Sequence, residues 1–148
     1  MPVIQSPSLL RLELSGNKIN RIPAGSVLPR IQWIDLSSND LTDGGIDPDA
    51  FNDITSVRAM ILNENSLTKF PVGLPSSIEQ LYINDNKIIE FSTLAVQHLS
   101  QLQKVEMRNN RVNDQVRMEH SWVIMYRVTL SVSSIVYYQL TTWCQINI

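Results

Sequence analysis

The sequence has few of the residues on which catalysis, metal binding and disulfide bonding depend. Its 148 residues include one cysteine, Cys144, and two histidines, His98 and His120. One cysteine excludes an intrachain disulfide, and the chain contains no phosphate-binding loop, nucleophile elbow or metal-ligand spacing. We therefore expect a protein that is not an enzyme and that uses neither a cofactor nor a metal ion.

The chain also has a small net charge and no long uninterrupted apolar run. The formal net charge is −2 and hydrophobic residues make up 43% of the chain, so bulk charge gives no reason to expect nucleic-acid binding. The most apolar stretch, residues 122–142, is interrupted by Arg127 and diluted by serines and threonines, which makes it a poor fit to a membrane helix. Residues 1–8 lack the basic and apolar regions of a signal peptide, and we interpret them as a residual N-terminal segment of an upstream unit.

One pattern recurs along most of the chain. Residues 78–88 read Ile-Glu-Gln-Leu-Tyr-Ile-Asn-Asp-Asn-Lys-Ile, which is L-x-x-L-x-L-x-x-N-x-L with aliphatic exchanges. Aligned copies place an asparagine at the ninth position five times, at Asn17, Asn39, Asn65, Asn86 and Asn110. Successive asparagines are roughly 21 to 26 residues apart, a period typical of leucine-rich repeats. Five in-phase copies predict a solenoid of stacked coils.

The spacing within each copy predicts how one coil folds. Aliphatic residues at the fourth and sixth positions share one face of a short strand, because strand side chains alternate between faces. The asparagine follows where the chain leaves the strand, and its amide can both donate to and accept from neighbouring backbone, which predicts a buried asparagine ladder. The predicted fold class is an α/β-type leucine-rich-repeat solenoid with a curved parallel β-sheet on its concave side. We assign residues 9–113 to this solenoid of five repeats.

The convex segments between strands are predicted to be of two kinds. Residues 22–29 and 70–77 are short and contain prolines, which favours extended backbone. Two longer segments favour 3₁₀ or short helical turns, because apolar residues recur every three positions: Phe51, Ile54 and Val57 in one, and Val96, Leu99 and Leu102 in the other. Gly44 and Gly45 are interpreted as a loop insertion in the second repeat.

Residues 114–148 leave the repeat pattern and form a non-repeat apolar tail. Between Val128 and Leu140 apolar residues recur at alternate positions, which is typical of a strand. Three interpretations remain open: an aberrant C-terminus without an evolved function, strands that cap the open end of the sheet, or a segment that contacts a membrane or a partner. If it is exposed, such a tail favours self-association.

The two kinds of coil carry a family likeness. Residues 74–88 read Leu-Pro-Ser-Ser-Ile-x-x-Leu-Tyr-Ile-Asn-Asp-Asn-Lys-Ile and residues 50–57 read Ala-Phe-x-x-Ile-x-x-Val; their alternation resembles that of the small leucine-rich proteoglycans and allied matrix glycoproteins. The resemblance implies a secreted extracellular-matrix protein whose concave sheet binds collagen fibrils, growth factors or other matrix components. The cysteine-rich caps of that family have no counterpart in this sequence, and neither does the Asn-x-Ser/Thr glycosylation signal.

The repeat register also predicts which side chains face the concave side. From the third, fifth and seventh positions we select a candidate ligand-binding set: Arg11, Trp33, Asp35, Ile61, Asn63, Gln80, Tyr82, Lys104, Glu106 and Arg108. Trp33, Ile61 and Tyr82 lie on the middle coils, and exposed aromatic residues are typical binding anchors. The alternative is that these side chains only shield the sheet. The mixed charges at both ends suit a protein partner with matching charges, or else they pair within the sheet.

Three functional interpretations follow. The leading one is a non-enzymatic protein-binding module, matrix-associated by family resemblance, that recognises collagen or another protein ligand. A second is a truncated or aberrant isoform without independent activity, which self-associates through its uncapped ends or tail. A third is an intracellular leucine-rich-repeat scaffold, suggested by the missing signal peptide and disulfides. A glycosaminoglycan is an alternative ligand, suggested by Arg108, Arg111 and Arg117 and opposed by the acidic residues near them.

Overall fold

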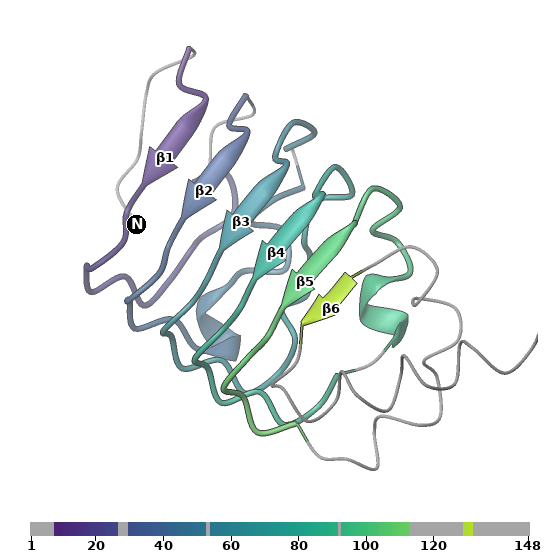
Figure 1. The fold of residues 1–148 in the computed structure, drawn as a ribbon. Coiled ribbons are helices and arrows are strands. Elements are labelled where there is room, and N and C mark those ends of the chain that lie inside the picture. Colours follow the sequence, from purple (N-terminus) through teal and green to yellow (C-terminus); the bar gives the residue numbers. More distant parts are fainter. Residues whose placement is uncertain (1–7, 27–29, 53, 92, 113–128, 132–148) are drawn as a thin grey trace, which may run out of the picture.

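Six short parallel strands form one sheet in the computed structural model, which describes residues 8–26, 30–52, 54–91, 93–112 and 129–131 (Figure 1). The strands follow one another across the sheet in chain order. They are β1 Arg11–Glu13, β2 Trp33–Asp35, β3 Ala59–Ile61, β4 Gln80–Tyr82, β5 Lys104–Glu106 and β6 Thr129–Ser131. The predicted leucine-rich-repeat solenoid with a parallel sheet is confirmed.

The register of the sheet follows from the repeat pattern. The central residue of each strand from β1 to β5 points into the core and pairs with the central residue of the next strand: Leu12, Ile34, Met60, Leu81 and Val105. The residues before and after it point outward, because strand side chains alternate between faces. A register shift by one residue would expose this whole row, so burial fixes the alignment of the coils.

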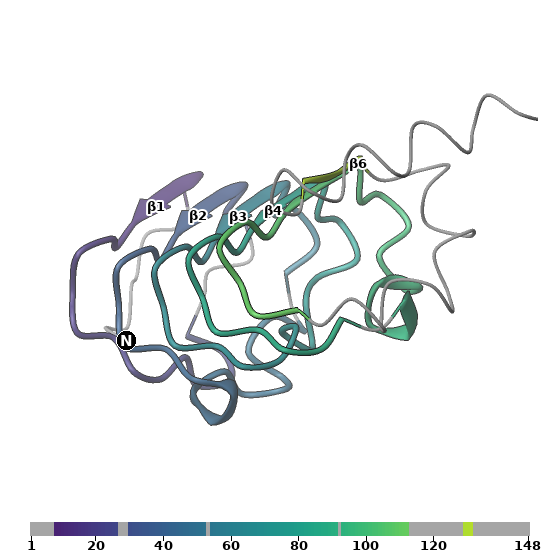
Figure 2. The same ribbon diagram turned by 60° about the horizontal axis from the view of Figure 1, so that its bottom comes forward.

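The core is one continuous apolar column inside the stack. Aliphatic residues at equivalent positions of successive coils are fully or almost fully buried, including Ile31, Leu36, Leu41, Val57, Leu62, Leu67, Ile78, Ile83 and Ile88. Figure 2 shows the sheet along one side of the stacked coils and the convex segments along the other. Each coil therefore buries its apolar edge against its neighbours, as expected for a solenoid.

The asparagine ladder is present and its middle members are buried. Asn39, Asn65 and Asn86 are 6–7% exposed. The Oδ1 atom of Asn65 accepts a hydrogen bond of 3.0 Å from the backbone N–H of Leu41 in the preceding coil. Its Nδ2 donates to carbonyl oxygens in both its own and the preceding coil. Asn110 repeats this arrangement at half-buried positions, whereas Asn17 is exposed and donates to Leu14 and Ser15 of its own coil.

The residue before each ladder asparagine turns the chain through the left-handed region. These residues are Gly16, Ser38, Glu64, Asp85 and Asn109, with φ between 52° and 69°. Four of them are not glycine, and this backbone conformation costs such residues about 1 kcal/mol or more. The backbone N–H of each of the first four donates to a carbonyl oxygen of the following coil, at 2.9–3.0 Å. The neighbouring coil therefore holds each turn in place.

The convex segments agree with the two predicted kinds, with one correction. The 3₁₀ helix η2 spans Thr93–Val96, and turns around Phe51 close through hydrogen bonds spanning three residues, from Ala50 to Asp47 and from Ile54 to Phe51. The described parts of the proline-bearing segments contain no helix. The interpretation of Gly44 and Gly45 as a loop is wrong, because they belong to the 3₁₀ helix η1, Asp43–Gly45, whereas their being an insertion in the second repeat stays a prediction. Gly45 is buried there against the backbone of Asn20 in the preceding coil.

Only a short part of the predicted tail is described. It forms β6, which pairs in parallel with β5 and places Leu130 opposite Val105. Residues 114–128 and 132–148 lie outside the described residues, as do residues 1–7, so the interpretations of the tail and of the N-terminal segment stay predictions. Within the described ranges, no helix is long and apolar enough to cross a membrane.

Candidate binding surface on the concave sheet

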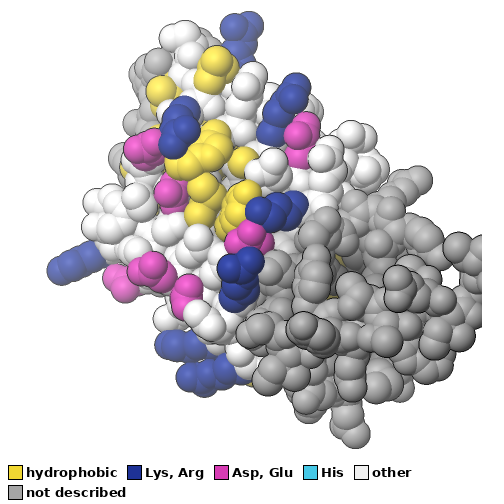
Figure 3. Space-filling model, viewed as in Figure 1, with side chains coloured by type: hydrophobic (Ala, Val, Ile, Leu, Met, Phe, Trp, Pro, Cys, Tyr) yellow, Lys and Arg dark blue, Asp and Glu magenta, His cyan; other side chains and the backbone are white. Residues whose placement is uncertain are grey.

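Strand pairing aligns the predicted concave side chains into two rows. The first row is Arg11, Trp33, Ala59, Gln80 and Lys104, and the second is Glu13, Asp35, Ile61, Tyr82 and Glu106. Neighbours within a row come from adjacent strands, whose backbones are about 4.8 Å apart. Figure 3 shows hydrophobic side chains gathered over the middle of this face, with charged side chains of both signs around them. We call the two rows the concave face.

An apolar centre lies on the middle strands of this face. It consists of Trp33 on β2, Ala59 and Ile61 on β3, and Tyr82 on β4, all of them half-buried. Ala59 is the smallest of the four, and it lies directly between Trp33 and Gln80 in the first row. The apolar centre therefore runs diagonally across three strands, over about 10 Å from β2 to β4.

A cation from β1 lies against the aromatic ring of Trp33. The guanidinium carbon of Arg11 is 3.6 Å from the ring centroid, within the range of a cation–π interaction. The Nε atom of Arg11 also pairs with Glu13 Oε1 at 2.6 Å. Both of these charged side chains are largely exposed, so the ion pair itself contributes little to stability. Its effect is to fix the position of Arg11 beside Trp33.

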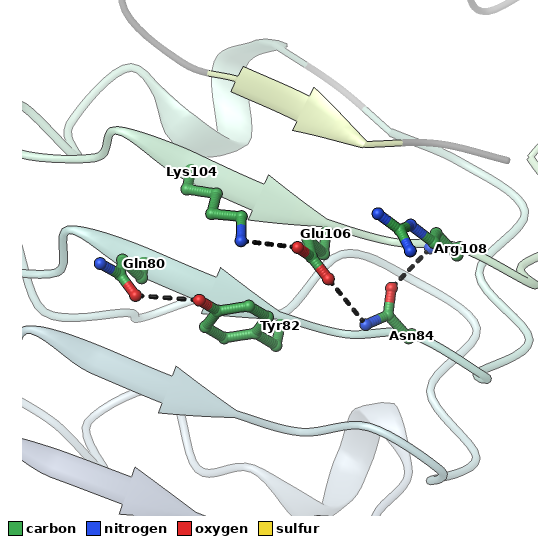
Figure 4. Close-up of polar contacts among 6 residues, drawn as sticks. All are labelled: Gln80, Tyr82, Asn84, Lys104, Glu106 and Arg108. Carbon is green, nitrogen blue, oxygen red and sulfur yellow. Dashed lines mark hydrogen bonds and ion pairs between the residues drawn. The ribbon is translucent and has the colours of Figure 1, made fainter. Parts of the chain in front are cut away.

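A second cation, from β5, lies near the aromatic ring of Tyr82. The Nζ atom of Lys104 is 4.9 Å from the Tyr82 ring centroid and 2.6 Å from Glu106 Oε1. The Tyr82 hydroxyl donates to Gln80 Oε1 at 2.9 Å (Figure 4). Both aromatic side chains are thus positioned by polar contacts. Sequence reasoning did not predict these cation–π pairs, although the adjacency of the members of each row could have suggested them.

The pKa values of Lys104 and Glu106 reflect their pairing. The hydrogen bond from Lys104 lowers the pKa of Glu106 below its ordinary value, which outweighs the opposite effect of partial burial, and Asn84 adds to the lowering. The same bond raises the pKa of Lys104. Both groups are therefore charged near neutral pH, and neither has the near-neutral pKa that suits a general acid or base.

Asn63 and Asn84 form a second, concave-side ladder that was not predicted. Asn63 Oδ1 accepts a hydrogen bond from the backbone N–H of Asn84, and Asn84 Oδ1 accepts one from the backbone N–H of Arg108, each at 2.8 Å. Asn84 Nδ2 also donates to Glu106 Oε2 at 3.4 Å (Figure 4). The Asn-x-Asn sequence shared by the third and fourth repeats is the signal that could have identified it.

Arg108 and His98 lie outside the two rows of the concave face. Arg108 contributes its backbone to the Asn84 contact at the end of β5, while Arg117 lies outside the described residues, so the proposed arginine group for a glycosaminoglycan stays a prediction. His98 lies on the convex side, with Nε2 3.3 Å from the carbonyl oxygen of Leu74. The described ranges bring together no group of three or more His, Cys, Asp or Glu residues that could hold a metal ion.

The fold and the ladder define the class of protein. The family description "Leucine Rich Repeat" matches residues 30–54, which include β2 and the ladder residue Asn39. Together with the parallel solenoid, this match shows that the chain is a leucine-rich-repeat protein.

Comparison with curated proteins shows which leucine-rich-repeat proteins this chain is similar to. Podocan from Mus musculus is 31% identical over 72% of this chain, and lumican from Bos taurus is 31% identical over 72%. Keratocan from Gallus gallus is 37% identical over 54%. The chain covers 18% of podocan, 31% of lumican and 23% of keratocan, so it spans well under half of these relatives. The repeats of this chain are similar to those of these small leucine-rich proteoglycans, which confirms the resemblance found in the sequence.

Proposed function

We propose that this chain is a non-enzymatic binding module whose concave face recognises a protein ligand. The observation that supports the proposal is the apolar centre, in which Trp33 and Tyr82 are half-buried and each lies beside a cation from the outer neighbouring strand. Aromatic side chains that are already held in place lose little conformational entropy when a ligand binds. They are also the residue types that most often dominate binding energy at protein interfaces.

The family suggests the kind of ligand and the location. We propose an extracellular-matrix protein that binds collagen or another matrix protein, on the strength of its relation to podocan, keratocan and lumican. The concave face fits a protein ligand by its composition, because an apolar centre with charged side chains of both signs around it resembles the hydrophobic core and polar rim of protein interfaces. A nucleic-acid ligand would call for a predominantly basic face instead.

The proposal is tested by truncating the two aromatic side chains. We expect Trp33→Ala and Tyr82→Ala each to weaken binding to immobilised fibrillar collagen, or to another matrix protein that the wild-type chain binds, by roughly 30-fold, as is typical of a binding hot spot. Surface plasmon resonance measures the affinities, and circular dichroism confirms that the variants fold.

Val72→Ala is the matched control. Val72 is 59% exposed and lies on a proline-bearing convex segment, so the same kind of truncation there leaves the concave face untouched. We expect its affinity to equal that of the wild type. Unchanged affinity in a folded Trp33→Ala/Tyr82→Ala double variant contradicts a binding role for the concave face.

A further inference from the structure

We infer that the ligand segment bound by the concave face carries a lysine or arginine side chain that pairs with Asp35, and that this pairing sets the direction in which the segment lies across the sheet. The inference rests on the proposed function and adds to it the chemistry and orientation of the partner. It follows from the charges on the second row of the concave face.

Three carboxylates lie in that row, and only two of them have a cation. Glu13 is 2.6 Å from Arg11 Nε, and Glu106 is 2.6 Å from Lys104 Nζ. No lysine or arginine among the described residues forms an ion pair with Asp35. Its Oδ1 atom accepts one hydrogen bond, at 2.8 Å, from the backbone N–H of Ser37. Asp35 therefore presents a negative charge that no lysine or arginine in the described part of the chain compensates.

Asp35 also borders the apolar centre. It lies on β2, two residues after Trp33 on the same face, and it is aligned with Glu13 on one side and Ile61 on the other. The half-buried carboxylate is thus next to another carboxylate, a cross-strand arrangement that is unfavourable on its own. A ligand that covers Trp33 and Ile61 also excludes water from Asp35.

The free energy of excluding that water decides which ligands fit. A carboxylate that loses its hydration without gaining a partner is strongly destabilised, which offsets much of what the apolar contact contributes. A ligand cation placed at Asp35 removes this cost and also reduces its repulsion with Glu13. An acidic segment meets two carboxylates there and is repelled.

The opposite end of the apolar centre does not require a cation from the ligand. Glu106 already accepts hydrogen bonds from Lys104 and Asn84, so a ligand can cover that end without supplying a cation. The two ends of the apolar centre therefore differ in the ligand group they require. The ligand segment needs a basic residue beside β2, whereas an uncharged residue suffices beside β4. An extended segment therefore binds in one direction across the sheet better than in the other. The occupant is accordingly a basic, otherwise apolar protein segment.

A random peptide library displayed on phage tests this inference, because it offers the concave face basic, acidic and apolar segments alike. The library is panned on the immobilised full chain and on the variants Asp35→Asn, Asp35→Lys, Trp33→Ala and Asp40→Asn. We expect the wild-type chain to enrich peptides that carry Lys or Arg at a constant distance from an apolar residue. Asp35→Asn should retain at least roughly tenfold fewer of these phage than the wild-type chain does. Asp35→Lys should select acidic peptides in their place.

Asp40→Asn is the control for the charge change. Asp40 belongs to the same repeat but is exposed beyond the ladder asparagine, so its variant should retain the wild-type peptides. Two results overturn the inference: the selected peptides lack a basic residue, or Asp35→Asn retains basic peptides as well as the wild type does. In either case the proposed function stands if peptide binding still depends on Trp33. Failure of the folded wild-type chain to enrich any peptide over the bare support, or equal retention by Trp33→Ala, contradicts the proposed function and the inference with it.

Discussion

At the scale of single residues, Gly44 and Gly45 show how differently two adjacent glycines can be constrained. A Cβ atom added to Gly45 would lie 2.3 Å from the carbonyl oxygen of Asn20, a backbone atom of the preceding coil. A Cβ added to Gly44 would meet no atom within 4 Å. Gly45 is therefore needed where two convex segments approach each other closely, whereas Gly44 is not.

This contrast gives a stability prediction. We expect Gly45→Ala to lower the free energy of unfolding by about 1–3 kcal/mol, because the coils must move apart to admit the methyl group. Gly44→Ala should change it by no more than about 0.5 kcal/mol. Urea denaturation followed by circular dichroism measures both values. Equal stability of the two variants would show that the convex segments adjust freely at this point.

At the scale of the elements, the strands could be predicted from the sequence more completely than the segments between them. The period-two pattern and the ladder asparagine place residues such as Ile34 and Leu81 inside and Trp33 and Tyr82 outside, and the structure has this register. The convex 3₁₀ helix at Gly45 was missed, because two adjacent glycines are typical of a loop. The close approach of Gly45 to the backbone of Asn20 involves another coil, so no local pattern records it.

The candidate site also has one part that the sequence predicts and one part that it does not. Membership of the two rows follows from the register alone, so the neighbours of Trp33 and Tyr82 could be named in advance. Whether Arg11 pairs with Glu13, stacks on Trp33 or does both depends on side-chain conformations that residue types do not specify. Side-chain conformations also decide that no described lysine or arginine pairs with Asp35. Binding by these residues remains a prediction.

The Lys104–Glu106 pair on β5 gives a prediction about pH. The pKa of Glu106 is lowered in the folded state, so its contribution to stability is present above the ordinary value of 4.5 and is lost as pH falls through the lower folded value. The pKa of Lys104 is raised, so its contribution is present below 10.5 and is lost as pH rises through the higher folded value.

Comparison with Glu106→Gln isolates this effect. We expect the difference in unfolding free energy between the wild type and Glu106→Gln to be constant near neutral pH, and to shift against the wild type as pH falls below 4.5. Urea midpoints measured across the acid range give this difference. A difference that stays constant down to about pH 3 would show that the pair has no energetic role in folding.

At the scale of the whole molecule, the ladder makes stability a property of neighbouring coils. Asn39 and Asn65 lie in successive coils, and both donate to the carbonyl oxygen of Leu36, at 3.1 and 3.0 Å. Asn110 donates to Ile83, Met107 and Arg108, so it shares none of these acceptors with Asn39. Interactions in the ladder are therefore local along the axis of the solenoid.

Double-mutant cycles with alanine test this locality. We expect Asn39→Ala and Asn65→Ala to be non-additive by about 0.5–3 kcal/mol, because each removal changes what the shared carbonyl oxygen can accept. Asn39→Ala and Asn110→Ala should be additive to within about 0.5 kcal/mol. Equilibrium unfolding in urea provides the four free energies of each cycle. Strong coupling between the distant pair would mean that the solenoid behaves as a single rigid unit.

The direction of the ladder bonds has a consequence for how the chain is made. The backbone N–H groups of Leu41 and Leu67 each donate to the ladder asparagine of the following coil, and the left-handed turn at Glu64 is held by a carbonyl oxygen of the following coil. A coil that has just left the ribosome therefore still lacks the acceptors that complete its turn. The hydrogen bonds of each coil are complete only when the next coil has been synthesised. Folding during translation therefore lags behind synthesis by about one repeat.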